Sequence, residues 1–442
     1  MKSKVSFVCQ ECGYDSPQWL GKCPECGMWN SLREIKITNS KLQTPNLGGG
    51  QKVNIEPKRL DQIRFEKKQR LLTGFSELDG VLGGGIVKGS AILLAGDPGI
   101  GKSTLLLQIA LKMSTEKEKV LYISGEESEE QIKLRAERIK TNKNKSSLLL
   151  LAQTNTDSVC EIIAKINPTL VIVDSIQTME SENVSGLSGS VGQVRYSAAS
   201  FIKIAKTLGI PVVMVGHVTK EGMVAGPMVL SHMVDTVLFL EGEKFTRTRI
   251  LRSLKNRFGP VDEIGLFAML DAGIKELNTP EQLFLSKTND GTISGSILSV
   301  TMEGSRAFLV EIQALVVNSK IPIPRRVASG IDYKRLELLL AVLQKHCNIP
   351  LSGMDVFVNV AGGIKLSDPG TDLSICLAII SSFQNIKLSN RIGIGEVGLL
   401  GEIRPANSLE KRVKEAQKLG FKNILSSNKF KTLKDVILSL TK

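Results

Sequence analysis

The hydrophobic and polar residues of the chain follow different patterns in different segments. Between Leu71 and Leu277, short apolar runs alternate with stretches of helical periodicity. This alternation is typical of a parallel β-sheet with helices on its faces. We therefore predict an α/β domain over residues 71–277. Its strands are expected at residues 92–95, 120–123, 148–151, 170–173, 212–215, 236–240 and 249–254.

The segments on either side of this domain have other patterns. Residues 38–70 are polar, contain a run of glycines and have an excess of lysine and arginine, which is typical of a linker. We predict a small N-terminal module over residues 1–37 and a separate α+β domain over residues 278–442. In this last domain, strands are expected at 307–317 and 355–361, and helices at 334–346, 371–383 and 409–419.

A phosphate-binding motif, G-x-x-x-x-G-K-[ST], follows the first expected strand and precedes a helix that includes residues 105–110. Its glycines let successive backbone N–H groups face phosphate oxygens, and the helix N-terminus adds its positive dipole end. Lys102 is expected to hold the β- and γ-phosphates and Ser103 to bind Mg²⁺, while Thr104 stabilises the turn or shares that role. The predicted ATP-binding residues are Gly96, Asp97, Pro98, Gly99, Ile100, Gly101, Lys102, Ser103 and Thr104.

Polar residues that follow other apolar strands are candidates for the rest of an ATPase site. Asp174 ends a strand that we expect beside the phosphate-loop strand, and it is predicted to organise Mg²⁺; the alternative is an N-cap. Glu126 is our candidate for the base that orients water, although Glu127 is an alternative and both could instead cap the helix at 128–140. His217 is either a sensor of the γ-phosphate or an ordinary polar side chain.

Cysteines near the N-terminus have the spacing C-x₂-C-x₁₀-C-x₂-C, which is typical of a zinc ribbon. A glycine follows the second cysteine of each pair, where it lets the backbone fold around a tetrahedral site. A disulfide framework is disfavoured in a chain without an export signal. The predicted zinc ligands are Cys9, Cys12, Cys23 and Cys26, and the expected core cysteines are Cys160, Cys347 and Cys376.

The charge and hydropathy of the chain restrict its partners. A formal net charge of +13 favours a polyanionic partner, although a lysine-rich solvated surface gives the same balance. No apolar segment approaches the ~20 residues that span a bilayer, and the first residues lack the apolar region of a signal peptide. We therefore expect no membrane partner and a cytoplasmic location.

Cations are concentrated at the end of the last expected strand, in Lys255-Asn256-Arg257-Phe258-Gly259. Together with the four cysteines, the segments 73–79 (TGFSELD) and 83–85 (GGG), and the phosphate loop, this pentapeptide makes almost the whole chain resemble the RadA (Sms) family of bacterial DNA repair proteins. The resemblance implies a RecA-like P-loop ATPase core with ATP, Mg²⁺ and Zn²⁺ as cofactors. It also implies homohexameric rings and DNA-stimulated ATP hydrolysis.

The family resemblance further implies processing or branch migration of recombination intermediates in double-strand-break repair. The implied partners are single-stranded and branched DNA and a recombinase of the RecA type. The resemblance implies that Lys255 and Arg257 act in catalysis or in coupling to DNA. By similarity to hexameric replicative helicases, we expect them to act in trans as a pair that contacts the nucleotide of a neighbouring subunit.

The C-terminal domain resembles the protease domain of Lon, but it departs from that pattern. Thr371 stands where the serine nucleophile would be and Glu410 where the lysine base would be. A carboxylate does not activate a hydroxyl as a desolvated amine does, so we expect no proteolysis. A scaffold with a basic surface for DNA is the remaining role, and its candidate residues are Lys345, Lys365, Arg391, Arg404, Lys411 and Arg412.

Three functions other than a DNA-dependent motor are compatible with parts of the sequence. A KaiC-like signalling ATPase or autokinase shares the glycine-rich and phosphate-loop segments, but it usually has a duplicated core, and one phosphate loop occurs here. An ATP-dependent protease is disfavoured by the residues at the Lon-like positions. A zinc-ribbon adaptor whose ATPase is only a switch is the weakest alternative.

Overall fold

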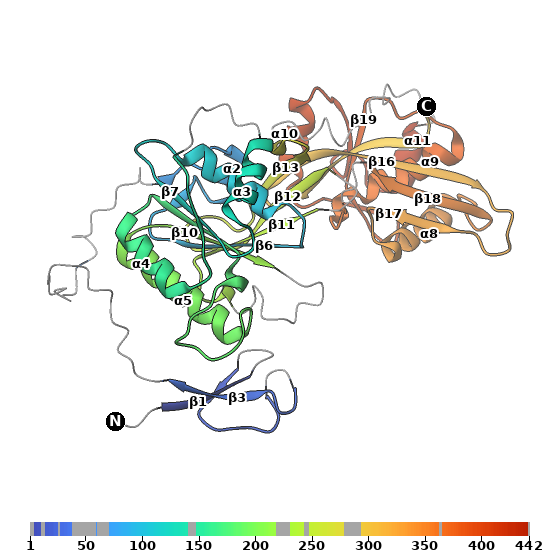
Figure 1. Cartoon of the computed structure of the whole chain (residues 1–442). Helices are drawn as coiled ribbons and strands as arrows, with labels where there is room; N and C mark the ends of the chain where they lie inside the picture. The colour runs from blue at the N-terminus through green and yellow to red at the C-terminus, as the bar shows by residue number, and fades with distance from the viewer. Residues whose placement is uncertain are drawn as a thin grey trace. The chain divides into compact units, whose positions relative to one another are not determined.

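A computed structural model describes residues 4–9, 14–24, 27–37, 59, 70–139, 147–217, 230–242, 247–277, 293–361 and 365–440. The chain forms two compact units, Met1–Glu276 and Leu277–Lys442 (Figure 1). None of the helices in the ranges above is both long and apolar enough to cross a membrane.

A nine-stranded sheet forms the centre of the first unit, in the order β14-β13-β12-β11-β6-β10-β9-β7-β8. The strands from β11 to β8 run parallel, and β12, β13 and β14 add antiparallel strands at one edge. The bounds are β6 Ala91–Gly96, β7 Val120–Ser124, β8 Leu149–Ala152, β9 Leu170–Asp174, β10 Val212–His217, β11 Thr236–Glu241, β12 Thr248–Asn256, β13 Ile264–Leu270 and β14 Gly273–Glu276.

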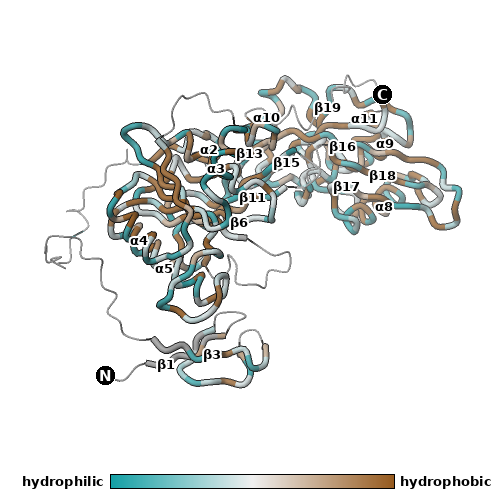
Figure 2. The backbone as a smooth tube through the Cα atoms, in the orientation of Figure 1, coloured by the Kyte–Doolittle hydropathy of each residue, from teal (hydrophilic) through white to brown (hydrophobic). Residues whose placement is uncertain are grey.

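Helices cover both faces of this sheet because its central strands are apolar on both sides. On β6, Ile92 and Leu94 join one buried cluster, whereas Ala91 and Leu93 join the cluster on the opposite face. Helices α2 and α3 pack on the first face and α4 and α5 on the second (Figure 1). Hydrophobic residues accordingly concentrate on the strands (Figure 2). The bounds are α1 Ser76–Val81, α2 Lys102–Met113, α3 Glu129–Arg138, α4 Thr156–Ile166 and α5 Val191–Leu208.

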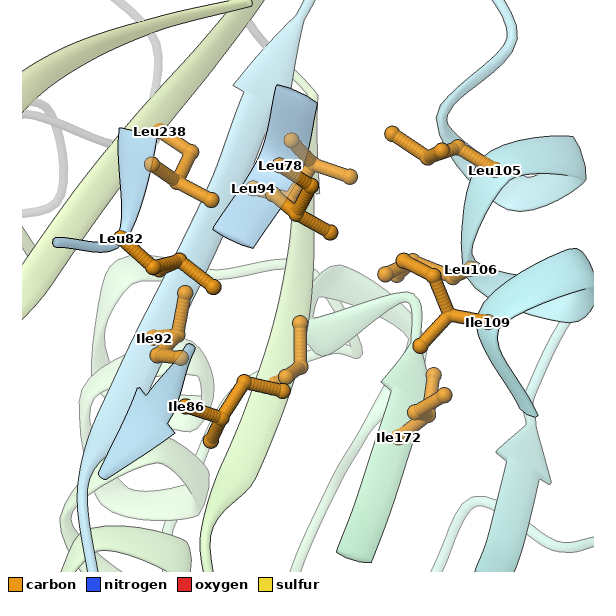
Figure 3. A pocket seen from close by; sticks show the side chains of 11 residues that line it. Leu78, Leu82, Ile86, Ile92, Leu94, Leu105, Leu106, Ile109, Ile172 and Leu238 are labelled. Carbon is orange, nitrogen blue, oxygen red and sulfur yellow. The ribbon is translucent and has the colours of Figure 1, made fainter. Parts of the chain in front are cut away.

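The core beneath α2 is made of aliphatic side chains from the sheet and the helices. Leu94 and Ile172 on the strands face Leu106 and Ile109 on α2 (Figure 3). These and neighbouring leucine, isoleucine and valine side chains surround a cavity of about 20 Å³. A buried water needs polar partners, which this lining does not offer. The cavity is therefore part of the packed core that anchors α2, and it is not a ligand site.

The seven strands predicted in this unit are all confirmed, with ends that shift by one or two residues. The expectation that the strand of Asp174 lies beside the phosphate-loop strand is wrong, because β10 pairs with both β6 and β9 and separates them. Strands β13 and β14 were not predicted. The two-residue strands β4 (Arg70–Leu71) and β5 (Ile86–Val87) form a small separate ribbon.

The N-terminal module is a small antiparallel sheet in the order β2-β1-β3. Strand β1 spans Lys4–Cys9, β2 spans Asp15–Ser16 and β3 spans Leu32–Ile37. The predicted linker at residues 38–70 lies outside the described residues except for Arg59 and Arg70.

The second unit is a mixed six-stranded sheet in the order β17-β18-β16-β15-β19-β22, with helices packed against it. Helix α9 packs on β15 and β16 and is almost entirely buried. All the predicted elements of this unit are confirmed, and β15, β17, β19, β22 and α11 were not predicted. The bounds are β15 Ser296–Glu303, β16 Arg306–Asn318, β17 Arg326–Ser329, α8 Tyr333–Cys347, β18 Met354–Val360, α9 Asp372–Gln384, β19 Arg391–Ile394, α10 Leu409–Lys418, β22 Asn423–Ser426 and α11 Leu433–Leu440.

Candidate nucleotide-binding site

The phosphate motif joins β6 to α2, as the sequence predicts, and α2 begins at Lys102 itself. Gly96 has a φ of 151° and Gly101 a φ of 115°, both in the region that favours glycine. A Cβ on Gly96 would lie 2.3 Å from the backbone oxygen of Leu240, on the neighbouring strand. The loop therefore passes so close to β11 that no side chain fits at this position.

Lys102 lies under the phosphate loop with a side chain that is only 4% exposed. Its Nζ donates to the backbone oxygens of Gly96 at 2.8 Å and Asp97 at 3.0 Å. Burial lowers the pKa of Lys102, and the carboxylates of Asp174, Asp97 and Glu126 act against this shift. These carboxylates thus lie close enough to Lys102 to interact with it.

Asp174 is the last residue of β9 and is buried. Because β7 and β9 are parallel, Ser124 at the end of β7 is its direct neighbour. The hydroxyl of the buried Tyr122 donates a hydrogen bond to Asp174 Oδ2. Burial, reinforced by the Asp174 charge, raises the pKa of Tyr122 well above its ordinary value, so this hydroxyl keeps its proton.

The two glutamates after β7 have different partners. Glu126 accepts a hydrogen bond from Ser175 Oγ at 2.6 Å, and its side chain is exposed. Glu127 forms an ion pair with Arg135 at 2.8 Å. Neither glutamate caps α3, so that alternative is wrong. The capping box consists of Ser128, whose Oγ accepts from the backbone N–H of Gln131, and the Gln131 side chain, which accepts from the N–H of Ser128.

Residues of two other strands, β10 and β12, also bear on the phosphate loop. His217 ends β10 in register with Gly96, but its side chain lies outside the described residues. Arg249 on β12 is 6% exposed, and its Nε donates to the backbone oxygen of Ile100 at 3.1 Å. Sequence analysis did not single out Arg249, because nothing in a local pattern shows that β12 returns past the phosphate loop.

Lys255 and Arg257 lie at the opposite end of the sheet from the phosphate loop. Asn256 pairs with Thr236, and Thr236 pairs with Ile92 at the start of β6, whereas Gly96 is at its end. Ile92 and Gly96 are separated by about 13 Å along a strand. The structure therefore does not bring these two cations to the nucleotide site of their own subunit.

The side chains of the two cations have different surroundings. Lys255 Nζ donates to the backbone oxygens of Ser231 and Val234, both at 2.7 Å. Burial and the neighbouring Arg257 lower the pKa of Lys255, and Asp235 opposes this. Arg257 is 58% exposed, and its Nη1 lies 3.8 Å from Asp235 Oδ1. Arg257 is therefore the more accessible of the two cations.

Cys9 and Cys23 share one buried cluster in the N-terminal module. The backbone N–H of Cys9 donates to the oxygen of Tyr14 at 2.8 Å, and that of Cys23 donates to the oxygen of Met28 at 2.9 Å. In both cases the N–H of residue i donates to the oxygen of residue i+5, so Cys9 and Cys23 have equivalent backbone hydrogen bonds. The ranges that the structure describes contain no complete metal cluster, since Cys12 and Cys26 fall outside them.

The Lon-like positions of the C-terminal unit lie in different environments. Thr371 is 1% exposed, and its Oγ1 donates to the backbone oxygen of Asp368 at 2.9 Å. Glu410 is exposed in the first turn of α10. The prediction that Arg412 belongs to a DNA-binding surface is wrong, because its side chain is fully buried. Its Nη1 donates to Asp368 Oδ2 at 2.5 Å and to the backbone oxygen of Val300 at 2.6 Å.

Two known proteins are similar to this chain over almost its full length. "DNA repair protein RadA" of Bacillus subtilis is 47% identical over 427 residues, which cover 96% of this chain and 92% of the relative. The protein of the same name from Halalkalibacterium halodurans is 45% identical over 433 residues, which cover 97% and 93%. The chain belongs to the RadA family of DNA repair proteins.

Three family models match parts of this RadA-family chain. They are an AAA domain at residues 56–223, a rubredoxin metal binding domain at residues 7–34, and subunit ChlI of Mg-chelatase at residues 334–429. The solved structure "Crystal structure of the RadB recombinase" is 26% identical and covers 47% of this chain and 100% of its own, with a TM-score of 0.38.

The predicted fold class is confirmed. This member of the RadA family has a RecA-like P-loop ATPase core, an N-terminal zinc-ribbon module and a Lon-like α+β C-terminal domain. An ATPase domain implies ATP as the substrate and Mg²⁺ as the cofactor that binds its phosphates.

Arg249 provides a test of how the phosphate loop is held. Replacing Arg249 with Gln removes a charged donor to the Ile100 oxygen, an interaction worth about 1.5–3 kcal/mol. We expect Arg249→Gln to weaken ATP binding about tenfold in an equilibrium fluorescence titration. Arg252→Gln is the matched control, because Arg252 on the same strand pairs with Glu241 instead. Equal ATP affinities for the two variants would contradict this account.

Proposed function

We propose that this chain is a DNA-dependent ATPase that processes and branch-migrates recombination intermediates during double-strand-break repair. One observation carries the ATPase part: the phosphate loop follows β6, Asp174 ends β9 and Glu126 follows β7, so the parallel strands bring all three to the same end of the sheet. Membership of a DNA repair family and a net charge of +13 support a nucleic acid as the partner.

Each residue of the site has a chemical role in this proposal. Residues Gly96–Thr104 hold the triphosphate, and Lys102 exchanges its two backbone acceptors for phosphate oxygens. Ser103 and Asp174 would hold Mg²⁺, which would neutralise charge on the phosphates. Glu126 orients the attacking water and takes its proton, while Ser175 fixes the carboxylate. Glu127 is less suited to this role because Arg135 holds its carboxylate.

Arg257 acts on a neighbouring subunit in this proposal, and Lys255 supports the segment that carries it. Their position at the far end of the sheet separates them from their own phosphate loop. Arg257 is exposed and could reach a second copy of the chain, where a cation would stabilise charge that develops on the phosphates. Lys255 is held by backbone oxygens and would position this segment. A closed ring, proposed as a homohexamer, gives every subunit such a neighbour.

The flanking modules connect the ATPase to its partners in this proposal. Cys9, Cys12, Cys23 and Cys26 bind one structural Zn²⁺, which requires the reduced thiols of the cytoplasm. The ribbon contacts DNA or a recombinase of the RecA type. The C-terminal unit is a non-proteolytic scaffold, in which the exposed Lys345, Lys365 and Lys411 contribute to a surface for single-stranded and branched DNA.

The ATPase proposal predicts DNA-stimulated turnover that depends on Lys102. Lys102→Ala should lower the ATP hydrolysis rate by about a hundredfold or more, because it removes a charged donor from the phosphates. The measurement is steady-state phosphate release with and without single-stranded DNA. Lys117→Ala, at an exposed lysine, should keep the wild-type rate. Wild-type protein that DNA does not stimulate, or a Lys102→Ala variant with unchanged turnover, would contradict the proposal.

The zinc proposal predicts about one zinc ion per chain by metal analysis. Cys23→Ser should lower that content sharply, since it removes one of four thiolates from the site. Cys160→Ser is the matched control: burial raises the pKa of the Cys160 thiol to about 12, which makes a thiolate ligand there unfavourable. The site would be wrongly assigned if the Cys23→Ser protein retained its zinc.

A further inference from the structure

Tyr122 is a buried tyrosine on β7 whose hydroxyl points toward the site. The other residues of this strand before Ser124 are aliphatic and fully or almost fully buried, as expected of a central strand. A phenylalanine would fill the same space without a polar group. The Tyr122 hydroxyl instead donates to Asp174 Oδ2 across the β7–β9 pair. A buried hydroxyl needs such a partner, and here the partner is the carboxylate at the end of β9.

Arg135 on α3 extends this interaction to the loop that carries the two glutamates. Its Nη2 lies 3.2 Å from Tyr122 Oη and 2.8 Å from Glu127 Oε2, and the side chain is only 14% exposed. Asp174, Tyr122, Arg135 and Glu127 therefore form one continuous hydrogen-bonded chain. This chain and the Ser175–Glu126 hydrogen bond tie the loop after β7 to the end of β9 at two points.

We propose that Tyr122 and Arg135 are positioning residues that fix the orientation of the Asp174 carboxylate for Mg²⁺. The inference rests on the proposed role of Asp174. A carboxylate at a strand end rotates easily about its last torsion, and a hydrogen bond to one of its oxygens removes this freedom. Arg135 in turn orients the tyrosine hydroxyl. Outer partners of this kind typically change metal affinity by about 10–100-fold when they are removed.

The test separates metal binding from nucleotide binding in the full-length chain. A fluorescent ATP analogue is titrated in EDTA and then at increasing Mg²⁺ concentrations. Tyr122→Phe keeps the buried ring and removes only the hydroxyl, so binding in EDTA should match the wild type. Mg²⁺ should increase the affinity for the analogue, and the Mg²⁺ concentration that gives half of this increase should be about tenfold higher than for the wild type. Arg135→Gln should shift it in the same direction by a smaller factor.

Two control variants make the outcome decisive. Tyr196→Phe removes a hydroxyl from a comparable pair, in which Tyr196 Oη donates to Asp157 Oδ1 at 3.0 Å, and it should leave the Mg²⁺ dependence unchanged. Asp174→Asn should abolish the Mg²⁺ dependence. If it does so while Tyr122→Phe and Arg135→Gln behave as wild type, the positioning role is overturned and the role of Asp174 stands. If Asp174→Asn retains the wild-type Mg²⁺ dependence, both proposals are overturned.

Discussion

The carboxyl ends of parallel strands lie at the same end of a sheet, and the candidate site of this chain depends on this arrangement. Strand β6 delivers the phosphate loop to this edge, β9 delivers Asp174, and β7 leads into the loop of Glu126. Strand β12 runs the other way along the sheet. Arg249, near its start, therefore lies beside the phosphate loop, and Lys255, near its end, lies at the opposite end of the sheet.

Much of this arrangement could be predicted from the sequence because its signals are local. The glycines and lysine of the phosphate loop are adjacent in the chain, and the apolar strands stand out by composition. The cysteine spacing predicted the N-terminal zinc ribbon, and family resemblance predicted the Lon-like C-terminal domain. In each of these cases the information lies within a few consecutive residues or in a motif that the family shares, so no knowledge of tertiary contacts was needed.

The features that sequence analysis missed depend on contacts between distant segments. The insertion of β10 between β6 and β9 is a matter of strand order, which no local pattern encodes. Strand β15 was missed because buried polar residues interrupt its apolar pattern; Ser299, for example, donates to the oxygen of Gly393 at 2.8 Å. Arg412 looked like a surface cation, but Asp368 and a backbone oxygen compensate for its burial.

The central proposal is that an ATPase site combines the phosphate loop of one subunit with Arg257 of a neighbouring subunit. Mixing Lys102→Ala protein with Arg257→Ala protein tests this most directly. Each variant alone should hydrolyse ATP poorly. In mixed assemblies, an Arg257→Ala subunit supplies an intact phosphate loop and its Lys102→Ala neighbour supplies an intact Arg257. We predict that the mixture regains part of the wild-type, DNA-stimulated rate. A mixture that never exceeds the sum of its components at any ratio would contradict the claim.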